Sequence, residues 1–268
     1  MKNHVQSFTN LDGLRRYLDT TPENNVFRGR RLGSQTGSEE FSGTESYAAA
    51  NVLLRDGDEK SAAALKAAAG VHINAAGEGY KVRRYAAVCG GTANVAAALI
   101  GLPRSMYATK KVTYKDSKVL NLCYNGSADC SVDKNEIAQT AAALTNAVLG
   151  LEKNGYRVNL YVYFGSRCST ESCNMFVRIK DSGQYIDVRK MAYPLVNPSM
   201  LRRHFLRFVE VVPGLKSSYF TIGHGTPIND RDHVQTCAKE AGLNLKKVVS
   251  FYDLRGMKTP EIVKMLSC

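Results

Sequence analysis

The chain has 268 residues, of which 44% are hydrophobic and 22% are charged, which is ordinary for a globular protein. No apolar run approaches the length of about eighteen residues that marks a membrane-spanning helix, and residues 1–5 lack the apolar stretch of a secretory signal. We therefore expect a cytoplasmic protein without a membrane partner. The net charge of +12 favours acidic partners such as nucleic acid, although the basic residues are scattered in short groups.

Patterns in residues 1–110 predict an N-terminal helical extension. Leucines at helical spacing predict a helix over 11–18. Residues 20–40 are rich in Gly, Ser, Asn, Glu and Arg without apolar periodicity, which indicates a flexible surface arm. The elements expected after this arm are a helix capped by Thr44, a helix capped by Asp58, a strand over 80–88 and a small helix over 93–100.

From residue 111 to residue 268, strand patterns alternate with helix patterns. The expected strands are 119–124, 156–164, 218–222 and 247–252, together with a hairpin of 175–180 with 185–188. The expected helices are 133–153, one that Ser199 opens, 231–241 and one that Thr259 caps. Repeated strand–helix units with short connections predict an α/β domain whose open, mostly parallel sheet is doubly wound, with helices on both faces.

The most specific signal is the polar loop Asn125–Ser131, which follows a predicted strand and precedes a long helix. In α/β proteins this position is where ligands bind. Asn125, Ser127 and Asp129 all offer oxygen atoms, which a hard cation such as Mg²⁺ prefers. The alternative is that Asn125 and Gly126 form a turn and that Asp129 or Ser131 caps the helix.

A strand ending in Asn125-x-Ser127-x-Asp129, followed by a helix and a second apolar strand, resembles the von Willebrand factor type A (VWA) domain. That family has a Rossmann-like sheet whose first strand carries an Asp-x-Ser-x-Ser metal-ion-dependent adhesion site (MIDAS). Through a divalent cation, the site binds an acidic residue of a partner protein. Here Asn125 stands in place of the Asp and Asp129 in place of the second Ser, so the resemblance implies a degenerate site.

The resemblance implies either no cofactor or a Mg²⁺ ion held by Asn125, Ser127 and Asp129. It also implies a binding surface to which neighbouring loops contribute. The further candidates for that surface are Ser131, Ser166, Thr170, His224 and Thr226.

Short patches along the chain also resemble an uncharacterised family encoded by tailed bacteriophages. These patches are 41–47 (F-x-G-T-x-S-Y), 50–58 (A-x-x-L-L-x-x-G-D), 101–106 (G-x-P-x-x-M) and the helix end 151–158. No activity comes with this resemblance. It implies a phage protein that acts in the host cytoplasm or in the virion.

The seven cysteines include no CxxC pair, so the sequence favours reduced thiols over structural zinc. A disulfide between Cys168 and Cys173 is conceivable from their spacing, but a cytosolic location argues against it.

Three functions stay open at this point. The favoured one is a non-enzymatic phage binding or assembly protein that docks a protein partner on the loop Asn125–Ser131 and its neighbours. The second is a metal-dependent enzyme that acts on nucleic acid or nucleotides, which would need several acidic and histidine side chains to converge. Its candidates are Asp129, Asp187, His224 and Asp253. The third is a basic nucleic-acid-binding module without catalysis.

Overall fold

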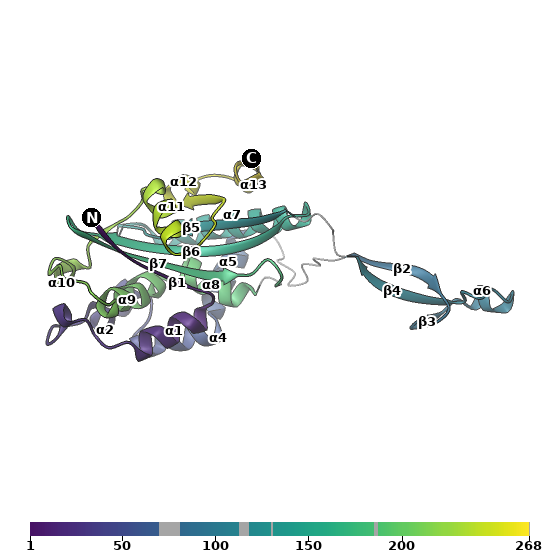
Figure 1. Cartoon of the computed structure of the whole chain (residues 1–268), viewed down its shortest axis with the longest axis horizontal. Coiled ribbons are helices and arrows are strands. Elements are labelled where there is room, and N and C mark those ends of the chain that lie inside the picture. Colours follow the sequence, from purple (N-terminus) through teal and green to yellow (C-terminus); the bar gives the residue numbers. More distant parts are fainter. Residues whose placement is uncertain (70–80, 113–117, 130, 185–186, 268) are drawn as a thin grey trace.

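The main sheet has six strands and is mostly parallel, with the order β1-β7-β6-β5-β9 and with β8 paired to β6 (Figure 1). Its strands are β1 (Lys2–Phe8), β5 (Val119–Asn125), β6 (Arg157–Arg167), β7 (Glu171–Lys180), β8 (Thr226–Pro227) and β9 (Lys247–Ser250). β5 is parallel to both β6 and β9, and β1 is parallel to β7, whereas β6 and β7 are antiparallel. The expected α/β class with a mostly parallel sheet is confirmed. This computed structural model describes residues 1–69, 81–112, 118–129, 131–184 and 187–267.

Successive side chains of a strand point to opposite faces of the sheet, so each strand can contribute to two cores. In the main sheet, both faces are covered. Leu122 of β5 and Leu160 of β6 enter the larger core, whereas Cys123, Tyr163 and Phe176 enter a smaller core on the other face. The larger core is closed by α1 (Leu11–Thr20), α4 (Tyr47–Asp56), α5 (Glu59–Ala69), α7 (Lys134–Lys153), α8 (Val188–Val196), η2 (Met200–Phe205) and α9 (Leu206–Val211). The smaller core lies under α11 (Arg231–Glu240).

Two short helices complete the larger core at the end of the chain. They are α12 (Phe251–Leu254) and α13 (Thr259–Ser267), which place Phe251, Leu254, Ile262 and Leu266 in it. The expected helices 11–18, 133–153 and 231–241 are all present as α1, α7 and α11. Among the residues that the structure describes, no helix is long and apolar enough to cross a membrane.

Strand β1 was not predicted, and it belongs to the main sheet. It pairs with β7 along its whole length, from Lys2 opposite Glu171 to Phe8 opposite Val177. The leucines of α1 then pack into the same core as the strands that follow residue 118. The first helices are therefore part of the α/β body, and the expected division of the chain at residue 110 does not follow the sheet.

The segment expected to be a flexible arm, residues 20–40, is packed against the body. It contains η1 (Asn25–Phe27), α2 (Gly33–Thr36) and the start of α3 (Glu39–Ser42). The fully buried guanidinium of Arg203 donates to the carbonyl oxygens of Ser34 at 3.0 Å, Gly37 at 2.8 Å and Thr44 at 2.7 Å. Because these carbonyls are satisfied from η2, a chain without apolar periodicity is held in one conformation.

Two predicted strands were wrong. Residues 218–222 contain aromatic and β-branched residues, yet α10 (Phe220–Gly223) forms there and ends at His224, whose φ of 57° is left-handed. The hairpin predicted across residues 181–184 is wrong in the described part of its second strand, because Val188 begins α8; the hairpin partner of β7 is β6, across the turn at residues 168–170. Asp187 instead caps α8 by accepting from Arg189 N and Lys190 N, and residues 185 and 186 lie outside the described chain.

One predicted helix cap and the two alternative caps of α7 were also wrong. Asp133 stands at the N-cap of α7, in place of Asp129 or Ser131, and its side chain makes no capping hydrogen bond. The side chain of Ser46 caps α4 by accepting from Ala49 N, whereas Thr44 was expected in that role. The cap expected from Asp58 is present, because its carboxylate accepts from Ser61 N at 3.0 Å.

Residues 81–112 form a small three-stranded sheet, which we call the ribbon. It consists of β2 (Lys81–Ala87), β3 (Thr92–Ala93), α6 (Val95–Leu99) and β4 (Met106–Val112). β2 and β3 both pair with β4 in antiparallel fashion, and a Cβ at Gly90 would lie 2.2 Å from Tyr107 O, so only glycine fits this turn. Figure 1 shows the ribbon apart from the main sheet.

Candidate functional site

The loop that starts at Asn125 lies at the carboxyl end of β5, in the middle of the parallel part of the sheet. β5 continues through α7 into β6 on one side, and β9 lies on its other side. In open α/β sheets, the crevice outside the carboxyl end of such a strand is where ligands bind. The structure therefore places the predicted loop at such a strand end, and its role in binding stays a prediction.

Asn125 and Ser127 use their side chains to hold the loop in place. Asn125 Nδ2 donates to Ile228 O at 2.7 Å, and its Oδ1 accepts from Ser127 N at 2.9 Å. Ser127 Oγ accepts from Gly165 N at 2.8 Å. The two residues are only 2% and 1% exposed, so both oxygen atoms are buried and already occupied by backbone donors.

Asp129 differs from these two residues because it is exposed. Its backbone N–H donates to Tyr252 Oη at 3.3 Å. A Mg²⁺ ion would need the oxygens of Asn125 and Ser127 to face the same point as the Asp129 carboxylate. The two buried oxygens instead face backbone N–H groups, so this donor set does not fit the expected ion. In the described part of the chain, no group of three or more His, Cys, Asp or Glu side chains is placed to hold a metal.

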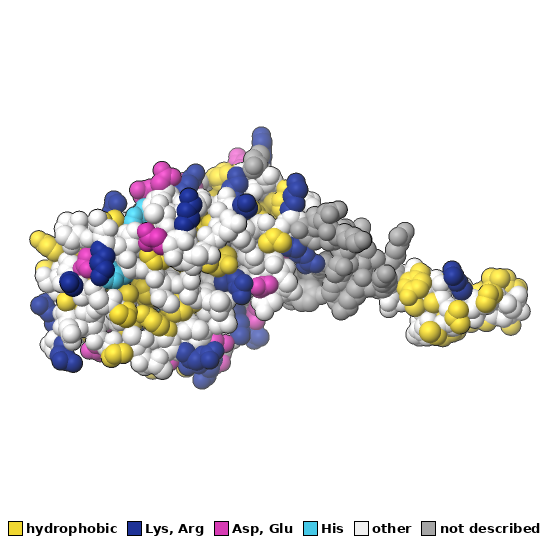
Figure 2. Space-filling model, in the orientation of Figure 1, with side chains coloured by type: hydrophobic (Ala, Val, Ile, Leu, Met, Phe, Trp, Pro, Cys, Tyr) yellow, Lys and Arg dark blue, Asp and Glu magenta, His cyan; other side chains and the backbone are white. Residues whose placement is uncertain are grey.

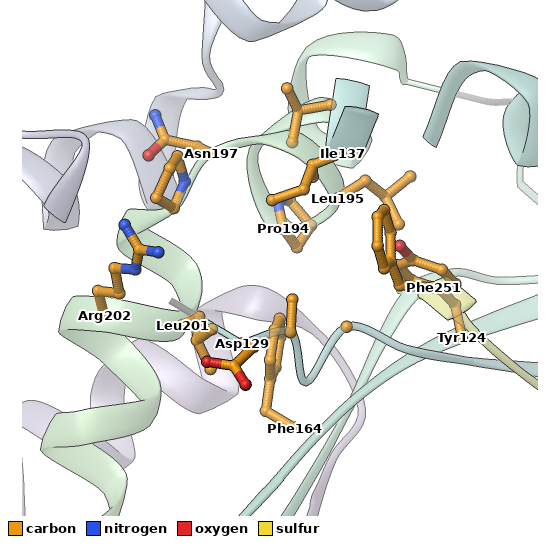
Figure 3. Close-up of a pocket in the computed structure, with 14 residues that line it drawn as sticks. Tyr124, Asp129, Ile137, Phe164, Pro194, Leu195, Asn197, Leu201, Arg202 and Phe251 are labelled. Carbon is orange, nitrogen blue, oxygen red and sulfur yellow. The ribbon is translucent and has the colours of Figure 1, made fainter. Parts of the chain in front are cut away.

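A narrow cleft of about 40 Å³, which we call the loop cleft, lies beside the loop (Figure 3). Most of its wall is apolar, and the residues that make this apolar wall are Tyr124, Gly126, Ala128, Ile137, Phe164, Pro194, Leu195, Val196, Pro198, Leu201 and Phe251. Figure 3 shows Arg202 and Asn197 on one side of the cleft, Tyr124 and Phe251 on the opposite side, and Asp129 near Phe164. The cleft thus offers an apolar interior with a carboxylate and a guanidinium in its wall.

The polar groups of the cleft are fixed by neighbouring segments. The Arg202 guanidinium lies 4.2 Å from the centre of the Phe41 ring and donates to Phe41 O at 2.5 Å. Burial raises the pKa of Tyr124 above its ordinary value, so that its hydroxyl stays neutral.

A wider hollow of about 740 Å³, which we call the helix groove, lies next to the loop cleft. Both hollows are lined by Val196, Asn197 and Pro198, so this short segment forms a wall that they share. Apolar lining of the groove comes from Ala49, Val52, Leu53, Ala64 and Ala138, and its charged residues are Glu39, Glu45, Asp58 and Lys60. Three carboxylates against one amine make this concave surface acidic, on a protein whose net charge is +12.

The shared wall is rigidly held. Asn197 Nδ2 donates to Asp58 Oδ2 at 2.7 Å, and Asn197 Oδ1 accepts from Ser199 N at 2.9 Å. Ser199 Oγ in turn donates to Ser42 O at 2.6 Å. The loop cleft and the helix groove are therefore preformed on the described body.

The structure does not bring the other predicted surface residues into either hollow. Ser166 is buried at the end of β6 opposite Pro227, and Thr226 is exposed opposite Arg167. Thr170 is exposed in the turn between β6 and β7, and Ser131 is exposed after the loop. These four residues lie outside the linings of the loop cleft and the helix groove.

His224 lies in a separate polar cluster. Its Nε2 is 3.2 Å from Oε1 of the fully buried Glu210, and its ring stacks on Phe27 with centroids 5.9 Å apart. Glu210 also accepts from Ser34 N at 3.0 Å. This cluster joins the N-terminal segment to α9, and it accounts for His224 without a catalytic role.

The convergence of Asp129, Asp187, His224 and Asp253 that a two-metal enzyme requires is not present. Asp187 caps α8, and Asp253 forms a capping box with Ser250 and pairs with Arg231 at 3.1 Å. Burial works to raise the pKa of Asp253, but hydrogen bonds from Ser250 and Arg231 hold that pKa below its usual range. The alternative of a two-metal cluster is therefore not met by these four residues, because Asp187, His224 and Asp253 are each held by local partners.

The five described cysteines are free thiols, so the conceivable Cys168–Cys173 disulfide is not formed. Cys168 lies in the turn between β6 and β7, and Cys173 is buried on β7. Burial works to raise the pKa of the Cys168 thiol, but hydrogen bonds with Ser217, Thr170 and Glu171 hold the pKa below its ordinary value.

The wall formed by residues 194–202 was missed by the sequence analysis. Its only local signals are Pro194 inside α8 and the dipeptide Asn197-Pro198, which marks a turn in any protein. Because these residues reach the loop only through the fold, a local pattern does not identify them.

The fold and the hollows define a mixed α/β protein with a preformed apolar cleft at the carboxyl end of its central strand. A family model described as "Domain of unknown function (DUF7192)" matches residues 2–266, so the chain belongs to the DUF7192 family. The match includes the ribbon as well as the body. No curated protein and no solved structure matches the chain.

Proposed function

We propose that this chain is a non-enzymatic binding or assembly protein whose VWA-like domain docks a segment of a partner protein. The single observation that carries the proposal is the loop cleft. It is a preformed apolar cleft beside the Asn125–Asp129 loop, and the oxygens of Asn125 and Ser127 are turned away from it to backbone donors. A rigid apolar cleft with a few polar groups in its wall suits an apolar anchor side chain.

The chemistry of the two hollows indicates what the partner segment carries. The loop cleft is small and mostly apolar, which suits one aliphatic side chain. The helix groove adds the exposed carboxylates of Glu39 and Glu45 to an apolar floor. Because the two hollows share the wall Val196–Pro198, one extended segment spans both of them. We therefore expect an apolar anchor that is followed by Lys or Arg residues.

Three features support the VWA-like and phage parts of the proposal. β5, α7 and β6 form a parallel strand–helix–strand unit, β9 lies on the other side of β5, and helices cover both faces of the sheet. The patches 41–47, 50–58, 101–106 and 151–158 support a tailed-bacteriophage protein that acts in the host cytoplasm or the virion. Docking here uses no metal ion, in contrast to the adhesion site that the VWA resemblance implies.

The experiment that tests the proposal is a selection from a random peptide library on the immobilised full chain. We expect the selected peptides to share an apolar residue next to Lys or Arg. The substitution Ala64→Arg adds a cation to the helix groove, and it should weaken the selected peptides about tenfold or more, which corresponds to about 1.4 kcal/mol.

The matched control is Ala63→Arg, which makes the same change on the same helix at an exposed residue outside the groove lining. It should leave the peptide affinity unchanged. Equal losses in the two variants, or selected peptides without basic residues, would overturn the proposed docking site.

A further inference from the structure

The ribbon carries a one-sided charge. Residues 81–112 contain six of the 36 Lys and Arg residues of the chain and none of its 24 Asp and Glu residues. The ribbon therefore supplies a charge of +6, which is half of the net charge of +12. Arg84 and Arg104 are exposed, and neither has an ion-pair partner among the residues that the structure describes.

The backbone pairing of the ribbon concentrates this charge. The register of β2 with β4 sets the position of Arg83 opposite that of Lys110, and the position of Arg84 opposite that of Thr109. Like charges at directly opposite positions of an antiparallel pair are destabilising. A ligand with closely spaced negative charges matches a strand pair whose sequence places basic residues at neighbouring backbone positions.

The tip of the ribbon is apolar and open to solvent. Val95 and Leu99 lie one helical turn apart on α6, and Leu99 and Ile100 are 82% and 72% exposed. Val88 and Leu102 are exposed as well, and Figure 2 shows hydrophobic side chains along the described ribbon. Several large aliphatic side chains exposed on one small element indicate a surface that binds something else.

We propose that the ribbon grips double-stranded DNA: its Lys and Arg residues contact the phosphates on both sides of a groove, and the tip residues Leu99 and Ile100 press between base pairs. A two-stranded β-ribbon fits a groove of DNA. Apolar side chains inserted at a base step kink the duplex by about 20–90°. A single DNA duplex would then contact both the basic strands and the apolar tip.

Duplex DNA fits these observations better than the two alternatives. The deep, narrow major groove of an RNA duplex excludes such a ribbon, and its shallow minor groove does not hold one. A protein partner with an apolar pocket would explain the tip, but it would not explain a ribbon that lacks every acidic residue. Both alternatives predict different outcomes in the experiment below.

The test uses the full chain and a short, fluorescently labelled DNA duplex, with the affinity measured by anisotropy between about 50 and 200 mM salt. The double variant Arg84→Gln, Arg104→Gln removes two exposed charges from the ribbon. We expect its affinity to fall about 10- to 100-fold and the slope of log affinity against log salt to become shallower by about 2.

The matched control is Lys246→Gln, Lys258→Gln, which removes two exposed charges from the body. It changes the net charge equally and should lower the affinity much less. Equal losses in the two variants would overturn the proposal, as would the absence of duplex binding by the unchanged protein at the lowest salt concentration. Equally tight binding to an RNA duplex would also overturn it.

The tip is tested separately with Leu99→Ser, Ile100→Ser, which keeps every charge. We expect energy transfer between dyes at the two duplex ends to report a kink with the unchanged protein and no kink with this variant. The slope of affinity against salt should stay unchanged, because the lost contacts are apolar. A kink that persists in the variant would overturn the insertion of the tip. If this variant instead changed only the self-association of the protein, the apolar tip would belong to a protein interface, and the proposal would fail.

Discussion

The body and the ribbon differ in the exposure of comparable leucine and arginine side chains. Leu160 of the body is completely buried, whereas Leu99 of the ribbon is 82% exposed. Arg203 of the body is buried among oxygen acceptors, whereas Arg104 of the ribbon is exposed. The body buries most of its large apolar side chains in two cores, although Ile222 and Tyr219 are exposed. Among the residues that the structure describes, nothing covers Leu99 or Ile100 of the ribbon to a comparable extent, and we propose that a ligand does so.

Within the body, the polar groups that hold the fold are different from those that could bind a ligand. Four buried polar side chains form hydrogen bonds with backbone groups and so hold the loops and the N-terminal segment in place. They are those of Asn125, Ser127, Arg203 and Glu210. The loop cleft and the helix groove, in contrast, are open to a ligand. These hollows and the ribbon are therefore the two surfaces on which we place function.

The largest expected effect concerns the buried cation of the body. Replacing Arg203 with Met leaves the carbonyl oxygens of Ser34, Gly37 and Thr44 without their donor. We expect the free energy of unfolding in urea to fall by about 3–5 kcal/mol. The neighbouring substitution Arg202→Met is the control and should cost only about 1 kcal/mol. Equal costs would mean that residues 34–44 are not held by Arg203.

The same leucine truncation in the two regions tests the comparison itself. Leu160→Ala opens a cavity in the larger core and should cost about 2–5 kcal/mol of unfolding free energy. Leu99→Ala at the ribbon tip should change it by less than about 0.5 kcal/mol. Denaturant unfolding curves of the two variants measure both values. A large loss from Leu99→Ala would show that the tip packs against the protein itself.

Replacing Asn125 with Ala tests whether the loop is a structural feature or a metal site. It leaves Ile228 O and Ser127 N unpaired in a buried place, so we expect a loss of about 2 kcal/mol. The exposed Asn135→Ala should cost less than about 0.5 kcal/mol. Addition of Mg²⁺ should not change the unfolding temperature of the unsubstituted protein. A Mg²⁺-dependent rise that Asp129→Ala abolishes would restore the metal-site interpretation.

A smaller effect is expected from the pH dependence of the body. The pKa of His204 is lowered from its ordinary 6.5 to about 3, mainly by burial and in smaller part by the nearby Arg203, while a backbone hydrogen bond with Ser199 opposes the shift. Below pH 6.5 the unfolded chain binds a proton that the folded chain does not, so stability falls as the pH drops towards 3.

Between pH 6 and pH 5 we expect a loss of about 1 kcal/mol from this residue alone. The loss should be absent in His204→Gln, which takes up no proton. Unfolding curves at the two pH values measure the difference, and identical pH profiles of the two proteins would rule out a buried neutral His204.

The parts of the fold that the sequence predicts are those with strong local patterns. α7 has leucines and valines at helical spacing between Asp133 and the stop at Asn154, and β5 and β6 are apolar runs of strand length. β1 was not predicted because its sequence, KNHVQSF, has little apolar content. Its partner strand β7 also lies far along the chain, since Lys2 pairs with Glu171, which is 169 residues later. Residues 218–222 have strand-like composition, but Gly223 and His224 end a helix there.

The position of the candidate loop follows from a local pattern, but its side-chain contacts do not. The order of strand, polar loop and helix predicts a crevice at Asn125, and the structure places this loop at the carboxyl end of β5. The partners of Asn125 and Ser127 are Ile228 and Gly165, which are far along the chain and give no local signal. The wall at residues 194–202 has the same limitation, because packing against the loop gives it a role that its own sequence does not encode.

The most direct test of the account is hydrogen exchange of the backbone amides, measured with and without a peptide from the library selection. We predict slower exchange at residues 126–129 and 194–202, which form the loop cleft, and along α4 and α5 beside the helix groove. Residues 81–112 should exchange at the same rate in both samples. Protection that is confined to the ribbon, or that spares the loop cleft, would contradict the proposed docking function.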